Sequence, residues 1–217
     1  MLSILAAVLS LQAAEAAPAA PAPGEGGIAI FHDLPFKHPV TLLLRRIDPA
    51  TGAFGETTME ISAGDFAAGS GRLHADDTVK QFHAAILAPG TYAMIGKVER
   101  IPDGDTVKVW TTCRPKDAEI FEMKPNGRVL VPAPVGMTFD PLEMEGQVQQ
   151  FLKADGAQLE KDLAAILSAN PSFAGAYERV QPALAVSFKS PRGAQECLKP
   201  GPAKGKIIPN KGAGAVN

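Results

Sequence analysis

The sequence has few of the side chains from which reaction centres are usually built. Its 217 residues include only two cysteines and four histidines, and the formal net charge is only −2. A charge this small creates no overall field that would attract nucleic acid, so we expect no nucleic-acid partner. With 46% hydrophobic and 20% charged residues, the chain has the profile of a globular protein.

Sequence motifs of common catalytic centres are also missing. The chain contains no G-x-S-x-G, no H-E-x-x-H and no G-x-G-x-x-G that opens a helix. The stretch GPAKGK (201–206) imitates a phosphate-binding loop, but it is one residue short and is followed by Ile207 instead of Ser or Thr. Neither cysteine has a convincing histidine partner. We therefore expect no catalytic residues and no cofactor.

No apolar run is long enough to cross a bilayer, which needs about 20 residues. Residues 2–11 form a short apolar run, and small residues at A-x-A spacing follow at Ala14 and Ala16. This arrangement predicts a secretory signal peptide over residues 1–17, although no Lys or Arg precedes the run; the alternative is a buried N-terminal helix. Residues 18–27 would form an Ala/Pro-rich spacer. We expect a periplasmic or secreted protein without a transmembrane segment in its mature chain.

Export would place Cys113 and Cys197 in an oxidising compartment, where two cysteines permit one bridge. The sequence therefore predicts a Cys113–Cys197 disulfide. Two free thiols, or an intermolecular link through Cys197, are the alternatives. A bridge that closes so long a loop stabilises the fold by about 4–5 kcal/mol in the chain-entropy model.

Short segments of alternating apolar and polar residues fill the interval from residue 28 to residue 135. Such alternation is typical of strands with one buried face, and no helical pattern intervenes. The predicted strands cover residues 28–34, 40–47, 57–62, 79–87, 92–98, 106–112, 119–123 and 128–131. The sequence therefore predicts a mainly β fold, an antiparallel β-sandwich over residues 28–135.

The chain changes character after residue 135, because apolar residues from Met144 to Leu167 recur at helical spacing. We expect residues 136–188 to form a C-terminal helical appendage that packs on the sandwich. It would include one kinked helix or two short ones, a further short helix at 173–180 and a last strand at 183–188.

The tail, residues 189–217, contains six Lys or Arg and one Glu and is rich in Gly and Pro. Because it has little to bury, we expect it to be largely disordered. A basic tail on an acidic body could contact anionic envelope polymers, fold back on its own domain, or serve as a solvated tail.

The segment LAPGTYAMIGKV (87–98) predicts a tight turn between two strands. Pro89 fixes φ and Gly90 accepts positive φ, while Tyr92 begins the next strand, where it can bury its ring and give its hydroxyl a partner. An apolar strand, Pro-Gly-Thr-Tyr and an alternating strand together resemble the edge of transthyretin-like (prealbumin-like) β-sandwiches, including carboxypeptidase-regulatory-type domains.

A later stretch, TTCRPKDAEIFEMKPNGRVLVPAP (111–134), is similar to the ending of small uncharacterised exported proteobacterial proteins. In these a Cys, an F-x-x-K-P-x-G hairpin and a final strand close the sandwich. The resemblance covers about half of the chain. It implies a non-enzymatic envelope module that binds or scaffolds, with an envelope protein or a polysaccharide as its partner.

Metal binding is the strongest chemical alternative, because exported bacterial proteins sometimes hold copper with His and Met. Met94 or Met123 could join the histidines, whose spacings match no ligand signature. The four candidate ligands are His32, His38, His74 and His83. His83 alternates in phase with Ala85 and Leu87, which also suits a histidine held within the sheet.

Loop carboxylates leave an envelope hydrolase as a second alternative. Asp76 and Asp77 lie in a Gly-rich stretch, and Asp103 and Asp105 flank a turn. Glycoside hydrolysis needs two carboxyl groups about 5–9 Å apart, which spacing in sequence does not establish. Adjacent acids in loops are usually solvated, so these are weak candidates for catalysis.

Trp110 is the only tryptophan, and it lies in the middle of a predicted strand. Alternation places Lys108 and Thr112 on its face and Val107 and Val109 on the other. Some sandwiches bind sugars by stacking them on an aromatic ring of a polar sheet face, so Trp110 is a candidate ligand contact. The interpretation we favour is that Trp110 packs beneath the helical appendage, which needs an apolar platform.

Overall fold

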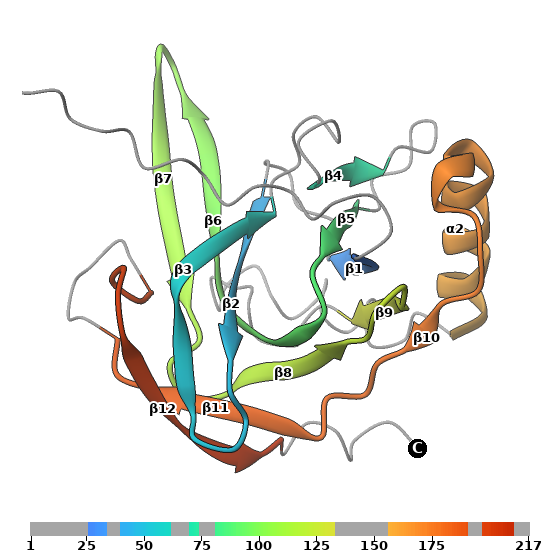
Figure 1. Ribbon diagram of the computed structural model, residues 1–217. Coiled ribbons are helices and arrows are strands. Elements are labelled where there is room, and N and C mark those ends of the chain that lie inside the picture. Colours follow the sequence, from blue (N-terminus) through green and yellow to red (C-terminus); the bar gives the residue numbers. More distant parts are fainter. Residues whose placement is uncertain are drawn as a thin grey trace, which may run out of the picture.

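The alternating segments form strands, and the strands form two sheets with one longer helix beside them (Figure 1). This computed structural model describes residues 26–33, 40–61, 70–73, 81–132, 156–190 and 197–210. The predicted signal peptide and almost all of the spacer lie outside these residues. The strands are β1 Gly27–Asp33, β2 Val40–Ile47, β3 Ala53–Ile61, β4 Ser70–Leu73, β5 Gln81–Leu87, β6 Gly90–Asp103, β7 Thr106–Cys113, β8 Ala118–Met123, β9 Arg128–Pro132, β10 Glu178–Arg179, β11 Leu184–Phe188 and β12 Ala203–Pro209.

The prediction of a mainly β, antiparallel sandwich with a helix near the C-terminus is confirmed. The helix is α2, Gly156–Ala169, and a 3₁₀ turn, η2, follows at Pro171–Phe173. The short helix expected at 173–180 is wrong, because the chain there becomes strand β10, paired with β9. Within the described part of the chain, no helix has the length and apolarity that crossing a membrane would require.

One sheet has five strands in the order β10-β9-β1-β5-β4, in which β9 runs parallel to β1 and to β10. The other has seven strands in the order β2-β3-β12-β11-β8-β6-β7, and β2 also pairs with β6. That pairing joins β2, β3, β12, β11, β8 and β6 into a closed circuit, here called the strand ring. Strand β6 makes this possible because Gly90–Ala93 pair with β8, Gly96–Asp103 pair with β7, and its other edge pairs with β2.

Three apolar clusters account for these layers. All six strands of the ring contribute to a cluster inside it, which includes Leu43, Ile95 and Phe188. Alternate residues of β2, β6 and β8 instead face the five-stranded sheet and form a second cluster with it. The opposite face of that sheet forms the third cluster with Leu163 and Ile166 of α2. Helix α2 therefore covers the five-stranded sheet, on the side away from the ring.

The prediction of a largely disordered tail is wrong for residues 197–210. Residues 203–209 form β12, which lies between β3 and β11 and completes the ring. Strand β12 can approach closely because residue 205 is Gly: a Cβ there would lie 2.3 Å from Cγ2 of Val186 and 3.2 Å from the Phe54 ring. The tail has few apolar residues of its own, and the rest of the chain supplies the surface on which it packs. Residues 191–196 and 211–217 lie outside the described residues.

The predicted disulfide is present and joins the end of β7 to the segment that leads into β12. Cys113 and Cys197 are bonded with their Cα atoms 5.1 Å apart, across a sequence separation of 84, and Cys197 is buried. Gly96 pairs with Cys113 across the sheet, and a Cβ at position 96 would lie 2.5 Å from Sγ of Cys197. The bridge therefore requires a glycine at this point of β6.

A buried arginine holds the same region from inside. The Arg45 side chain is fully buried, and its guanidinium donates to four backbone carbonyls. Nε bonds to Gly55 O at 2.5 Å, Nη2 to Glu56 O at 3.0 Å and Nη1 to Lys199 O at 3.0 Å; Nη2 also bonds to the carbonyl of Gly201. Burial lowers the pKa of Arg45, although an arginine stays charged in proteins. The contacts tie β2 and β3 to the start of the C-terminal strand.

Replacing Arg45 with Met is expected to lower the free energy of unfolding by about 3 kcal/mol or more. Each buried carbonyl that loses its donor costs about 1–3 kcal/mol, and Met supplies no donor. Urea denaturation of the oxidised protein measures the change. Arg46→Met is the control, because Arg46 is the exposed neighbour and should cost about 1 kcal/mol or less. Equal losses in the two variants would contradict the role assigned to Arg45.

Candidate binding surface

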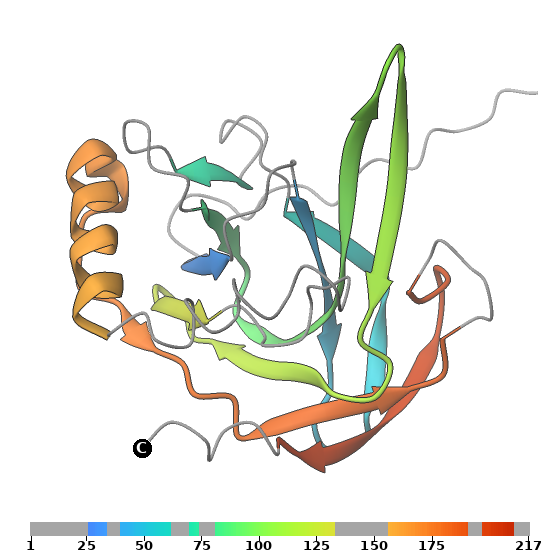
Figure 2. The same ribbon diagram turned by 180° about the vertical axis from the view of Figure 1, so that it is seen from behind.

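The β6–β7 hairpin extends beyond the body of the protein. The pairing of β2 with β6 ends at Glu99, whereas the pairing of β6 with β7 continues to Asp103 and Thr106. Figures 1 and 2 show the resulting ribbon standing out from the rest of the chain in opposite views. Residues 99–110 are called the arm below. Gly104, with φ of 59°, occupies the first central position of its two-residue turn, where hairpins favour glycine.

Large apolar side chains are exposed on both faces of the arm. Trp110 is 61% exposed, Val107 58% and Val109 45%. Alternation places the two valines on one face and Trp110 with Lys108 on the other. Strand β7 ends the order of its sheet, so within the described part of the chain its second edge has no partner strand. An open edge with exposed apolar residues is a surface that pairs readily with another chain.

The base of the arm is fixed by polar contacts. Lys97, with a side chain only 3% exposed, forms an ion pair with Glu99 two residues along the same strand. Nη1 of Arg100 donates to Oγ1 of the buried Thr41 at 2.9 Å. At the tip, Lys108 and Asp103 form an exposed ion pair of 2.8 Å. These contacts favour one direction for the arm relative to the ring.

The favoured prediction for Trp110, packing beneath the helical appendage, is wrong. Helix α2 packs on the five-stranded sheet, where Ile30, Phe82 and Leu130 form its apolar platform. That sheet is apolar on both faces, which alternation within single strands does not reveal. The register keeps Thr112 on the face of Trp110, and it places Glu99 opposite the indole. Trp110 is therefore available as a contact for a partner.

The structure places the Pro-Gly turn at the edge of the ring, away from the arm. Gly90 has φ of 149°, and Tyr92 is 1% exposed in β6. The Tyr92 hydroxyl donates to Ala88 O at 2.6 Å and accepts from Nε of Arg46 at 3.3 Å. Nη2 of Arg46 donates to Pro89 O at 2.7 Å, so the exposed arginine spans the turn. These residues shape the turn, and none of them projects as a ligand contact.

The candidate metal ligands are not brought together among the described residues. His83 is fully buried in β5, opposite Phe31 of β1. His32 belongs to β1, but its side chain lies outside the described part, as do all of His38 and His74. Met94 and Met123 are buried in the cluster between the sheets. Over the described ranges, no three His, Cys, Asp or Glu side chains form a group that could hold a metal ion.

Two of the four candidate carboxylates lie among the described residues and two do not. Asp103 and Asp105 flank the exposed tip of the arm, where Asp103 pairs with Lys108. Asp76 and Asp77 lie outside the described residues. A different carboxylate, that of Glu119 of β8, is partly buried, with its side chain 14% exposed.

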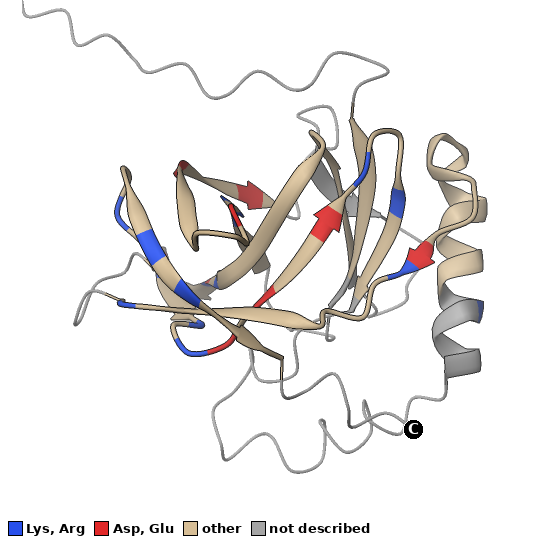
Figure 3. Cartoon of the chain, turned by 60° about the horizontal axis from the view of Figure 1, so that its bottom comes forward, with Lys and Arg blue, Asp and Glu red and all other residues tan. Residues whose placement is uncertain are grey.

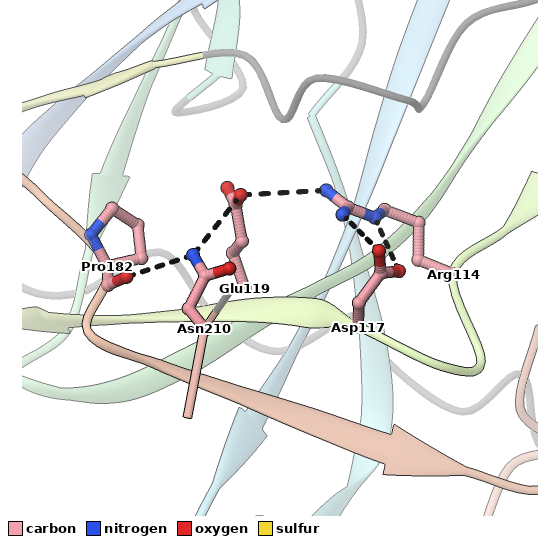
Figure 4. A network of polar contacts seen from close by, with 5 residues as sticks. All are labelled: Arg114, Asp117, Glu119, Pro182 and Asn210. Carbon is pink, nitrogen blue, oxygen red and sulfur yellow. Dashed lines mark hydrogen bonds and ion pairs between the residues drawn. The ribbon is translucent and has the colours of Figure 1, made fainter. Parts of the chain in front are cut away.

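Glu119 belongs to a polar network that joins the two ends of the C-terminal hairpin to β8 (Figure 4). Nδ2 of Asn210 donates to Pro182 O at 2.9 Å and to Oε1 of Glu119 at 3.5 Å. Nη1 of Arg114 lies 3.9 Å from Oε1 of Glu119, and its Nη2 pairs with Asp117 at 3.0 Å. Burial raises the pKa of the Glu119 carboxyl above its ordinary 4.5, while Arg114 and Asn210 act in the opposite direction. The network secures the hairpin to the ring.

We expect the contribution of Glu119 to stability to decrease as the pH rises. Because its pKa is higher in the folded protein than in the unfolded chain, the folded state binds the proton more tightly. The free energy of unfolding of the native protein, minus that of Glu119→Gln, should therefore fall from pH 4.5 upwards and level off above the raised pKa. Urea denaturation across a pH series measures this difference. Glu122→Gln, exposed in the same strand, is the control, and an equal slope in both variants would contradict the assignment.

Comparison of the chain with protein-family models, with curated proteins and with solved structures found no match.

Proposed function

We propose that this chain is an exported, non-catalytic binding or scaffolding protein of the bacterial cell envelope, and that its arm is the contact surface. One observation carries the proposal. The only tryptophan of the chain is 61% exposed on a projecting hairpin, with Val107 and Val109 exposed on the opposite face. Exposed aromatic and aliphatic side chains are typical of the anchors in protein interfaces.

The sequence and the disulfide support the proposed location outside the cytoplasm. The apolar run and A-x-A spacing at the N-terminus are typical of secretory signals. A bridge between Cys113 and Cys197 suits an oxidising compartment such as the periplasm or the exterior. The resemblance to transthyretin-like modules, which is carried by Pro89, Gly90 and Tyr92, also suits a binding role.

The geometry of the arm favours a protein partner over a polysaccharide. A sugar would stack on the Trp110 ring and use one face of the ribbon only. A partner strand added to the open edge of β7 would use backbone groups, and side chains on both faces could contact it. Both faces of β7 carry exposed apolar side chains, which supports strand addition.

Site-specific photo-crosslinking in the native envelope tests the proposal. A photoreactive residue at Val109 should yield an adduct with one envelope protein, whereas the same residue at exposed Lys161 of α2 should not. Trp110→Ala should reduce the Val109 adduct about tenfold or more, the effect of losing an interface anchor. It should leave the unfolding midpoint within a few degrees, because the indole is largely exposed.

Two outcomes would contradict the proposed protein partner. An equal yield of adduct from Val109 and Lys161 would show that the arm is not a preferred contact. Absence of adducts, together with retention on an envelope polysaccharide that Trp110→Ala abolishes, would assign the ring of Trp110 to sugar binding instead.

A further inference from the structure

The C-terminal hairpin, β11 and β12, carries exposed lysines that pair with no carboxylate in the part of the chain that the structure describes. Lys189, Lys204 and Lys206 line a shallow groove of about 440 Å³, here called the lysine groove, with Phe188 and Leu198 among its other lining residues. None of the residues that line it is acidic. Figure 3 shows Lys and Arg positions gathered at this end of the molecule. The groove lies on the ring, on a different hairpin from the arm.

The register of the hairpin brings the lysines close together. Phe188 pairs with Gly205, so continuing the register by one residue places Lys189 opposite Lys204. Lys206 follows Lys204 on the same face, about 7 Å further along the strand. Residues directly opposite each other in antiparallel strands have Cβ atoms about 5 Å apart. The three ammonium groups therefore belong to one small area of the surface.

This arrangement is unfavourable for the folded chain alone. Like charges opposite each other on a sheet destabilise it, whereas opposite charges would stabilise it. Among the described residues, Lys97, Lys108 and Lys124 each pair with a carboxylate, but no ion pair includes any lysine of the groove. The lysines of the groove therefore repel one another, and a bound anion would reduce this repulsion.

The groove is also held in place before any ligand arrives. Arg45 binds the carbonyls of Lys199 and Gly201, and the disulfide fixes Cys197 at the start of the segment. Strand β12 pairs with β3 on one side and with β11 on the other. A site that is already ordered loses little conformational entropy on binding.

We infer that the lysine groove binds an acidic polysaccharide, a chain of sugars that bear carboxylate or phosphate groups. Three lysines whose Cβ positions lie about 5–7 Å apart match charges repeated along a polymer. Phe188 and Leu198, each 8% exposed, give the groove an apolar lining. A concave site fits a chain better than it fits a flat bilayer surface. The inference goes beyond the proposed function and does not depend on the arm.

Calorimetric titration with an oligogalacturonate of defined length, on the full oxidised protein, tests the inference. The triple variant Lys189→Gln, Lys204→Gln, Lys206→Gln should bind at least tenfold more weakly than the native protein. The control triple variant, Lys124→Gln, Lys161→Gln, Arg179→Gln, removes the same charge from exposed positions on other elements and should keep the native affinity. A phosphorylated oligosaccharide of the same length shows which anion the groove prefers, and a neutral one should not bind.

A second measurement separates a binding site from a merely solubilising patch. Without ligand, the groove variant should unfold about 1–3 °C higher than the native protein, because it removes repulsion between like charges. The control variant should show no such gain. A lower unfolding temperature for the groove variant would overturn the inference, as would equal oligogalacturonate affinity in the two variants. Binding of the native protein to anionic lipid vesicles but to neither acidic oligosaccharide would overturn it in favour of a membrane surface.

Discussion

The structure depends on one constraint: the C-terminal strand, β12, must pair with the rest of the chain to close the ring. Strand β12 pairs with β3 at only two positions, Ala203 with Phe54 and Lys204 with Ala53, which makes this the shortest pairing in the ring. Arg45 spans the same seam, because two of its carbonyl partners belong to β3 and two precede β12. A buried charge is tolerated only where dipoles replace its hydration, and the four carbonyls provide them. The seam is thus closed by a side chain in addition to backbone hydrogen bonds, which include Gly201 N to Glu56 O at 3.0 Å and Gly205 N to Gly52 O at 2.8 Å.

Closure of the ring also explains where the two exposed surfaces lie. Strand β6 needs one edge for β2 and the first part of the other for β8, so only its distal half remains for β7. The hairpin continues past the ring because nothing else in the described chain pairs with β7. Cys113 ends β7 and Cys197 precedes β12, so one covalent bond connects the base of the arm to the segment that carries the lysine groove.

Sequence reasoning succeeded where the signal is local. The apolar-rich segment 40–47 and the alternation in residues 106–112 identified β2 and β7 closely, and the presence of only two cysteines made their pairing a simple inference. It failed where burial depends on a distant partner. Strand β12 has little apolar content, and its place in the ring follows from Gly205 and from the surface of β3 and β11. Arg45 and Arg46 are adjacent and alike in sequence, yet one is buried among carbonyls and the other is exposed. The platform for α2 was misplaced because single-strand patterns do not show which sheet is apolar on both faces.

Because part of the tail forms strand β12, its positive charges are held together at one place on the surface. A net charge of −2 conceals a strongly basic C-terminal segment, and in a flexible chain such charges would spread apart and be screened. Pairing of β12 with β3 and β11 prevents this, since the lysines are held at strand spacing on one face. Any anion that binds the groove of the folded protein, and not the unfolded chain, must stabilise the closed ring by mass action. Ring closure and anion binding are therefore thermodynamically linked, because Arg45 and the disulfide position the same strand that presents the lysines.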